Sequence, residues 1–350
     1  MSQNGYLSTA SYIKSEITTI SSTSEDPLTN CVGKTTYNKG IEIIWDIVKS
    51  QIKITNQNYI DEVKKIEEKN INYDNYWIKV VLATGNEVKV SPNIFSNHSF
   101  YIQRLIKESK SKMLVVKCTS FDPIALQKVL FYITYGVLEF SLDEVGQIAR
   151  VAASFEMSNV MNDIELSLTS FGTYPSHLLV KILSISCHED YLITIKTKKL
   201  ILQIVNENLS KLLQSKEFFK LSPSALVKLL NFDELEVIDE VEVFRIAMYY
   251  LIVGNNQLYA DPILNCVRFN NMNDIEIKAV HNISETYGDL YTKAILNYYI
   301  ENDLLYQKNN NEERVRNMNL LCKRNKGNGS ISVIMKTLEK KYFTLMKHDS

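Results

Sequence analysis

The feature that most constrains the fold is a strand-like segment that begins at Trp77 and reads WIKVVLAT. Short runs of β-branched and apolar residues are typical of strands. Gly85 and Asn86 follow this run and predict a tight turn, so residues 87–90 are expected to return as the second strand of a hairpin. The run MLVVKC at 113–118 is also short and rich in apolar and β-branched residues, and it predicts a third strand. The chain must therefore fold around a small sheet.

Helical periodicity dominates the chain beyond the third strand. Apolar residues recur there three and four positions apart, and Gly136 stands where the first of these helices should end. After a loop signal at 171–175 the helical pattern continues to about residue 306, with Ser222 before a proline as a helix start. We predict an α+β fold, in which a three-stranded sheet with helices precedes an all-α region of stacked helical hairpins.

The two ends of the chain differ in composition and in the spacing of their apolar residues. Residues 1–37 are rich in Ser and Thr without periodic apolar positions, which predicts disorder. Residues 38–72 carry apolar side chains at roughly helical spacing and predict a helical extension. From residue 308 onward ten Lys or Arg face four Asp or Glu, so the end is a basic tail in which 332–346 predict a terminal helix. The predicted parts are 1–37, 38–72, 73–171, 176–306 and 307–350.

Charge and hydropathy exclude several classes of function. The formal net charge of −1 gives no overall attraction to nucleic acid or to an anionic membrane, so nucleic-acid binding would depend on the basic tail. We find no apolar run of the roughly 18 to 20 residues that a membrane helix needs. The first residues lack the basic start and apolar core of a secretory signal, which favours a cytoplasmic or nuclear protein.

No pattern of catalytic or metal-binding residues is present in the sequence. The five histidines include no HExxH pair, and the five cysteines are far apart without zinc spacing. Nucleotide-binding glycine loops and the GxSxG nucleophile motif are missing as well. We therefore predict a protein that is not an enzyme and that has no cofactor and no metal site.

Residues 77–170 resemble a BTB (POZ) domain. The stretch EVKVSPNIFSNHSFYIQRL at 87–105 is similar to the family's hairpin and first helical pair. FYITYGVLEF at 131–140 resembles its helix end, glycine and short strand, and the residues at 141–168 resemble its last two helices. The order and spacing of these segments make the resemblance specific.

Residues 178–283 resemble the BACK region that follows BTB in kelch-like proteins. The strongest match is EFFKLSPSALVKLLNFDELEVIDEVEVFRIAMYYL at 217–251, and VRF at 267–269 also fits. Kelch repeats carry Gly-Gly pairs, whereas this sequence has none and contains only 11 glycines. The usual propeller of that family is therefore not expected within these residues.

The resemblance implies a protein-interaction adaptor that recruits a substrate protein to a cullin-RING ubiquitin ligase. BTB proteins engage a cullin through an apolar-x-Glu motif, and Ile106 and Glu108 stand at that place. The helical pair that opens BACK extends the same face in the family. The candidate residues for cullin binding are Ile106, Glu108, Leu178, Leu179, Ile182 and Leu183. All the apolar members of this set can equally be core residues.

The resemblance also implies a homodimer, or a heterodimer with another BTB protein. The candidate dimer region is Trp77, Ile78, Pro92, Ile94 and Phe95. The family usually has an Asp where Ile78 stands and a His-Lys pair at positions 91 and 92. In its dimeric members that Asp and that Lys help to form a charged cluster near the dimer centre. Both charges are replaced together here. This departure favours an alternative function, a scaffold that takes no part in ubiquitin transfer. Such a scaffold would form oligomers in structural or transcriptional regulation. A buried Ile106 would also favour this alternative.

Overall fold

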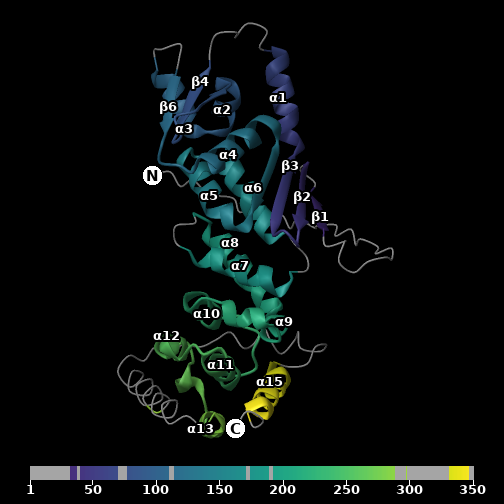
Figure 1. Ribbon diagram of the computed structural model, residues 1–350, viewed down its shortest axis with the longest axis vertical. Coiled ribbons are helices and arrows are strands. Elements are labelled where there is room, and N and C mark those ends of the chain that lie inside the picture. The colour runs from purple at the N-terminus through teal and green to yellow at the C-terminus, as the bar shows by residue number, and fades with distance from the viewer. Residues whose placement is uncertain are drawn as a thin grey trace, which may run out of the picture. The chain divides into compact units, whose positions relative to one another are not determined.

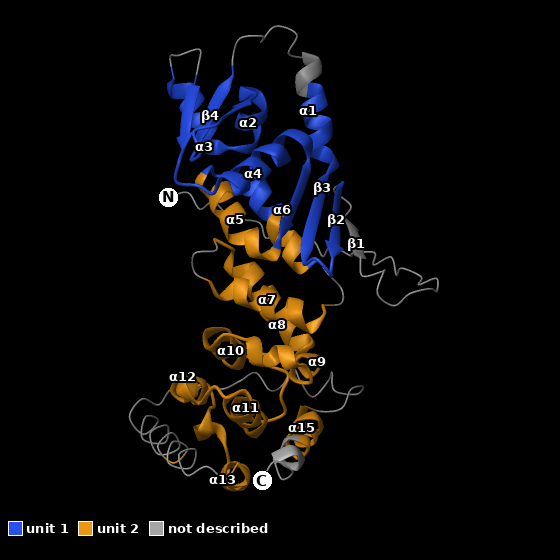
Figure 2. Ribbon diagram, viewed as in Figure 1, with its two compact units in different colours: residues 1–141, 155–163, 170–172 blue, residues 142–154, 164–169, 173–350 orange. Residues whose placement is uncertain are grey.

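The computed structural model describes residues 32–37, 40–69, 77–109, 114–170, 174–188, 192–287, 297 and 331–346. The chain divides into two compact units, shown in different colours in Figure 2. Unit 1 contains residues 1–141, 155–163 and 170–172, and unit 2 contains residues 142–154, 164–169 and 173–350. Among the described residues, no helix has both the length and the apolar character needed to cross a membrane.

The predicted three-stranded sheet is confirmed in unit 1 (Figure 1). Strand β4 (Ile78–Leu82) lies in the middle, antiparallel to β5 (Glu87–Val90) and parallel to β6 (Leu114–Cys118). Gly85 adopts a φ of 82° in the turn between β4 and β5, a conformation that glycine takes without strain. Alternate residues of β4 are buried, so one face of this sheet forms part of the core.

A second, four-stranded sheet in unit 1 corrects the prediction for residues 38–72. Strands β1 (Val32–Tyr37), β2 (Ile41–Asp46), β3 (Gln51–Asn56) and β7 (Val137–Ser141) pair antiparallel in that order. Among the described residues of the predicted extension, only α1 (Gln57–Lys69) is helical. Disorder was likewise the wrong prediction for 32–37, which form β1, and residues 1–31 lie outside the described residues.

The physical reason for the error is the period of the apolar residues. Ile41, Ile43 and Trp45 are buried at every second position of β2, and Ile52 and Ile54 are buried in the same way on β3. A period of two buries one face of a strand, whereas a helix would scatter these side chains around its axis. Cross-strand pairing brings Trp45 opposite Ile52.

The helices of unit 1 pack against these sheets. They are α1, α2 (Pro92–His98), α3 (Phe100–Glu108), α4 (Pro123–Tyr135) and the first half of α6 (Ser158–Thr169). The side chain of Asp122 caps α4 by accepting a hydrogen bond of 2.8 Å from the backbone N–H of Ala125. Gly136 ends α4 with a φ of 70°, as the sequence predicted.

Replacing Gly136 by alanine is expected to lower the free energy of unfolding by about 2–3 kcal/mol. A Cβ atom there would lie 2.6 Å from the carbonyl oxygen of Asn56 and 2.7 Å from Cγ1 of Ile60, at a φ that alanine tolerates poorly. Urea unfolding measures the loss. Gly85→Ala is the matched control, because its φ is also positive but its Cβ would meet no atom within 4 Å. Equal losses in the two variants would contradict the steric explanation.

Unit 2 is helical throughout its described residues, as predicted for the region after the loop at 171–175. Its α-helices are α5 (Val145–Ser154), the second half of α6, α7 (Ser176–Cys187), α8 (Ile195–Glu207), α9 (Leu209–Leu213), α10 (Pro223–Leu230), α11 (Glu240–Met248), α12 (Ala260–Leu264), α13 (Asp274–Thr286) and α15 (Ile331–Met346). Ser222 caps α10 by accepting a hydrogen bond of 3.2 Å from Ala225, which confirms the predicted helix start. Most of 288–306 lies outside the described residues.

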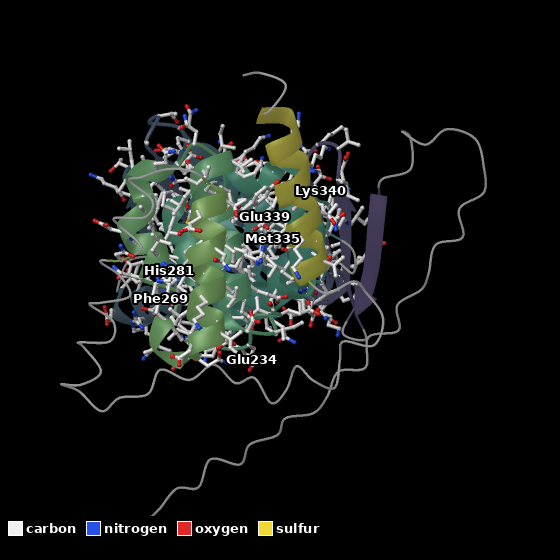
Figure 3. All side chains as sticks on the ribbon, turned by 90° about the horizontal axis from the view of Figure 1, so that it is seen from below. Glu234, Phe269, His281, Met335, Glu339 and Lys340 are labelled. Atoms are coloured by element: carbon white, nitrogen blue, oxygen red, sulfur yellow. The ribbon has the colours of Figure 1, made fainter. Side chains whose placement is uncertain are left out.

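The terminal helix predicted within the basic tail is α15. Met335 is fully buried and Ile331 nearly so, which anchors this helix on unit 2. Arg245 of α11 forms an ion pair with Glu339 of α15, and both side chains are largely buried. Figure 3 labels Met335 and Glu339 on this helix. The remainder of the tail lies outside the described residues.

Candidate interaction surfaces

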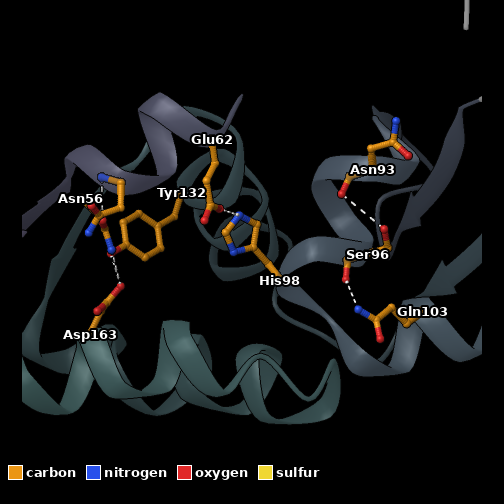
Figure 4. A network of polar contacts seen from close by, with 9 residues as sticks. Asn56, Glu62, Asn93, Ser96, His98, Gln103, Tyr132 and Asp163 are labelled. Atoms are coloured by element: carbon orange, nitrogen blue, oxygen red, sulfur yellow. Dashed lines mark hydrogen bonds and ion pairs between the residues drawn. The ribbon is translucent and has the colours of Figure 1, made fainter. Parts of the chain in front are cut away.

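A buried polar network holds the β3–α1 corner of unit 1 in place (Figure 4). The carboxylate of Asp163, on α6, accepts hydrogen bonds of 2.6 Å from the hydroxyl of Tyr132 and 3.0 Å from the side-chain amide of Asn56. Burial raises the pKa of Asp163, and the two hydrogen bonds act in the opposite direction. The network joins the end of β3 to α4 and α6, so it fixes the second sheet within unit 1.

His98 occupies the neighbouring part of the same core. Its ring centroid lies 4.2 Å from that of Tyr59, and its Nε2 is 4.0 Å from the carboxylate of Glu62. Burial lowers the pKa of His98 to about 4. Figure 4 places His98 beside Glu62 and also shows Gln103 donating to the backbone carbonyl of Ser96. At neutral pH the imidazole is uncharged and packs as an aromatic ring.

His98 is expected to lower the free energy of unfolding by about 3 kcal/mol as the pH falls from 6.5 to about 4, because the unfolded chain binds a proton there and the folded chain does not. The folded state keeps His98 neutral until about pH 4, whereas the unfolded chain takes up the proton near pH 6.5. Lower pH therefore favours the unfolded state across this window. Urea unfolding of wild type and His98→Gln at pH 7 and pH 4.5 isolates the contribution from other titrating groups. The same pH dependence in both proteins would refute it.

Helix α3 presents the predicted cullin motif at the surface of unit 1. Ile106 is half-buried and Glu108 is exposed, whereas Ile102, one turn earlier, is fully buried. Part of the Ile106 side chain is thus accessible while the rest packs on the domain. The exposure of Ile106 satisfies the first requirement for a contact residue and does not by itself separate the adaptor from the scaffold alternative.

Two contacts fix the position of α3. Arg104 binds the carboxylate of Glu156 through both terminal nitrogens, one of them at 2.8 Å, and Ser99 donates a hydrogen bond of 2.6 Å to the carbonyl oxygen of Phe155. Glu156 has a φ of 53°, which is unusual for a residue with a side chain. The Arg104 guanidinium holds the pKa of Glu156 below its usual range. The outer surface of α3 is therefore held against a defined corner of unit 1.

The candidate cullin residues in unit 2 are core residues, which corrects the prediction of a contact surface. The side chains of Leu178, Leu179, Ile182 and Leu183 are all fully buried. Three exposed apolar residues that were not among the predicted ones lie just before α8 and within its first half. They are Leu192, Ile195 and Leu200, with exposed fractions of 53%, 75% and 40%. The sequence pattern could have shown this, because Ile195 and Leu200 do not share the face of α8 on which Thr197, Ile201 and Val205 are buried.

The candidate dimer region is also mostly core. Ile78 and Phe95 are fully buried and Ile94 nearly so, which means that these three cannot form a contact with a second chain. Trp77 is 45% exposed and Pro92 is half-buried, so only these two remain accessible. Phe131 and Tyr135, on the outer face of α4, are more than half exposed and were not among the predicted residues.

Within the described ranges, no cluster of three His, Cys, Asp or Glu side chains could hold a metal ion. Cys118, Cys187 and Cys266 are free thiols, and burial raises the pKa of Cys118 to about 11. A thiol with so high a pKa is a poor nucleophile at neutral pH.

Comparison with known proteins matches two successive stretches of the chain to families. Residues 67–171 match the BTB/POZ domain, and residues 185–282 match BACK, described as "BTB And C-terminal Kelch". The chain is 24% identical over 217 residues to Kelch-like protein 31 of Homo sapiens, covering 61% of this chain and 32% of that protein. It is 21% identical over 243 residues to Kelch-like protein 31 of Danio rerio, covering 67% and 37%. The chain thus spans about a third of the length of these relatives.

Proposed function

The chain is a BTB–BACK protein of the kelch-like type, and on this premise we propose that it recruits substrate proteins to a cullin-RING ubiquitin ligase. The observation that carries the proposal is the accessible Ile106–Glu108 motif on α3 of a BTB domain. Adaptors of this kind act in the cytoplasm or the nucleus. The protein would work by holding two others together, and not by chemistry of its own.

Ile106 supplies the apolar anchor of the proposed contact, and Glu108 supplies a charge at its rim. An apolar side chain that enters a groove on a partner gains free energy from desolvation, while a charge at the rim selects the partner and its orientation. Because Arg104 and Ser99 fix α3, little conformational entropy is lost on binding. In unit 2, Leu192, Ile195 and Leu200 are exposed apolar residues that offer a separate contact surface.

Dimerisation is part of this proposal. Two copies would present two substrate sites to one ligase assembly, which raises the effective concentration of the catalytic module at the substrate. The substrate would be held by residues 1–70, by the basic tail or by the outer surface of the BACK region.

Co-purification from native cells tests the proposal. A tagged full chain is expected to bring down a cullin together with its RING partner, and the Ile106→Asp variant is expected to lose both. Recovery of substrates or other BTB proteins without a cullin would reject the ligase function and leave the scaffold alternative.

A scaffold outside ubiquitin transfer is the second candidate function. It is favoured by Ile78, which is fully buried where dimeric relatives usually carry an Asp. Such a chain would select its BTB partner by apolar packing instead of by the charged cluster. This candidate would be favoured if the protein keeps its normal stability and its partner proteins in cells that lack the cullin.

A further inference from the structure

Helices α11, α13 and α15 of unit 2 enclose a groove with a volume of about 430 Å³. Helix α11 packs against both of the others, and side chains of all three line the groove. On α13 the lining side chains are spaced three or four positions apart, so they form one wall, and Ala279, Asn282 and Thr286 among them are short. A ligand can therefore approach α13 closely. The volume lies within the range of roughly 300–1,000 Å³ that is typical of ligand sites.

The wall formed by α15 is basic. Lys336, Glu339 and Lys340 are spaced three and four positions apart, so they share the face of α15 that lines the groove. Both lysines are exposed, and Figure 3 labels Glu339 and Lys340 on this helix. Arg245 of α11 adds a third cation, whose side chain is only 15% exposed. Among the described lining residues these three cations face one carboxylate, so the groove has a local excess of positive charge in a chain of formal net charge −1.

Arg245 is held in place and keeps hydrogen-bond donors for a ligand. Its guanidinium carries five N–H donors, and in the described part of the chain Glu339 accepts a hydrogen bond from one of its terminal nitrogens. Glu339 thus fixes the guanidinium in the groove and leaves further N–H groups for a second acceptor. A positioned guanidinium with ammonium groups beside it is an arrangement that suits carboxylate oxygens.

We propose that this groove binds an acidic segment of a substrate protein, with an Asp or Glu carboxylate of that segment between Arg245 and Lys336. The inference rests on the proposed adaptor function and names the class of substrate. The exposed side-chain amide of Asn282 can donate to and accept from a peptide group, which favours a polypeptide over a free anion. Nucleic acid is a poorer match, because its affinity comes from many phosphate contacts along a longer basic surface.

Fluorescence polarisation with the full chain tests the groove. The probe is a short fluorescein-labelled peptide with equal numbers of glutamate and leucine residues, and we expect a dissociation constant at or below about 100 µM. Lys336→Glu is expected to raise it at least about tenfold, because the change replaces an attraction by a repulsion. Lys341→Glu is the matched control, since Lys341 is exposed on the same helix but does not line the groove. Thermal unfolding shows that both variants fold.

Three results would overturn the assignment of the groove. One is the absence of binding by the folded wild-type chain at about 1 mM. Another is an equal loss of affinity in Lys336→Glu and Lys341→Glu, which would reveal a general attraction between opposite charges. The third is tighter binding of a short DNA duplex that carries the same number of charges, lost in Lys336→Glu, which would assign the groove to nucleic acid.

Titration of the same proteins with the cullin amino-terminal domain separates this inference from the proposed function. Lys336→Glu is expected to keep the cullin affinity of the wild type, because Lys336 lies in unit 2 and the Ile106–Glu108 motif lies on α3 of unit 1. A wild-type chain that binds the cullin but not the peptide would overturn the acidic-segment site alone. A chain that binds the peptide but not the cullin would overturn the ligase function and leave the site in place.

Discussion

Replacing Ile106 by aspartate is expected to weaken the binding of this chain to the cullin amino-terminal domain by at least about 100-fold, or about 2.7 kcal/mol. The substitution removes an apolar anchor from α3 and would bury a carboxylate at the contact, where it has no partner. Part of the Ile106 side chain packs on the domain, so thermal unfolding of the variant is measured beside its binding to show that unit 1 is folded. Isothermal titration calorimetry with both purified proteins measures the change.

Two neighbouring positions serve as controls for that experiment. Lys107 is exposed, so Lys107→Asp alters charge on the same turn of α3 without removing an apolar contact. Ile102 is fully buried, so Ile102→Asp should unfold the domain and shows what a loss of structure looks like. Unchanged affinity in a folded Ile106→Asp protein would remove α3 from the proposed interface.

Replacing Asp163 by leucine is expected to lower the free energy of unfolding by about 3–5 kcal/mol. The change leaves the Tyr132 hydroxyl and the Asn56 amide buried without their acceptor. Both donors lie where β3 and α4 meet α6, so the second sheet should loosen first. Urea unfolding gives the total loss, and amide hydrogen exchange of residues 41–56 locates it.

Asp163→Asn is the matched control for the leucine variant. The amide keeps one acceptor oxygen and nearly the same volume, so about half of the loss is expected. In a double mutant with Tyr132→Phe the losses should be less than additive, because both substitutions break the same hydrogen bond. A loss below about 1 kcal/mol in Asp163→Leu would show that the network contributes little to stability.

The central fold could be predicted because its signals are local. The turn at Gly85 and Asn86, the cap at Ser222 and the helix end at Gly136 each depend on residues within a few positions. The strands at 41–56 were missed because the alternation of their apolar residues was read as helical spacing; β2 and β3 pair with each other locally, and only β3 also pairs with the distant β7. Helical and strand patterns overlap in short apolar runs.

The candidate site could be predicted only in part for a related reason. Spacing identifies which residues share a helix face, but it does not say whether another element covers that face. Leu178 and Ile182 share such a face on α7, and it is buried. Phe131 and Tyr135 lie on the exposed side of α4, beside the buried Tyr132, a difference that no local pattern reveals.

The most direct test of the account is calorimetric titration of the purified full chain with the cullin amino-terminal domain. The account predicts one cullin domain bound per chain, with a dissociation constant at or below about 1 µM. The absence of binding heat across several temperatures, with the chain shown to be folded, would contradict it.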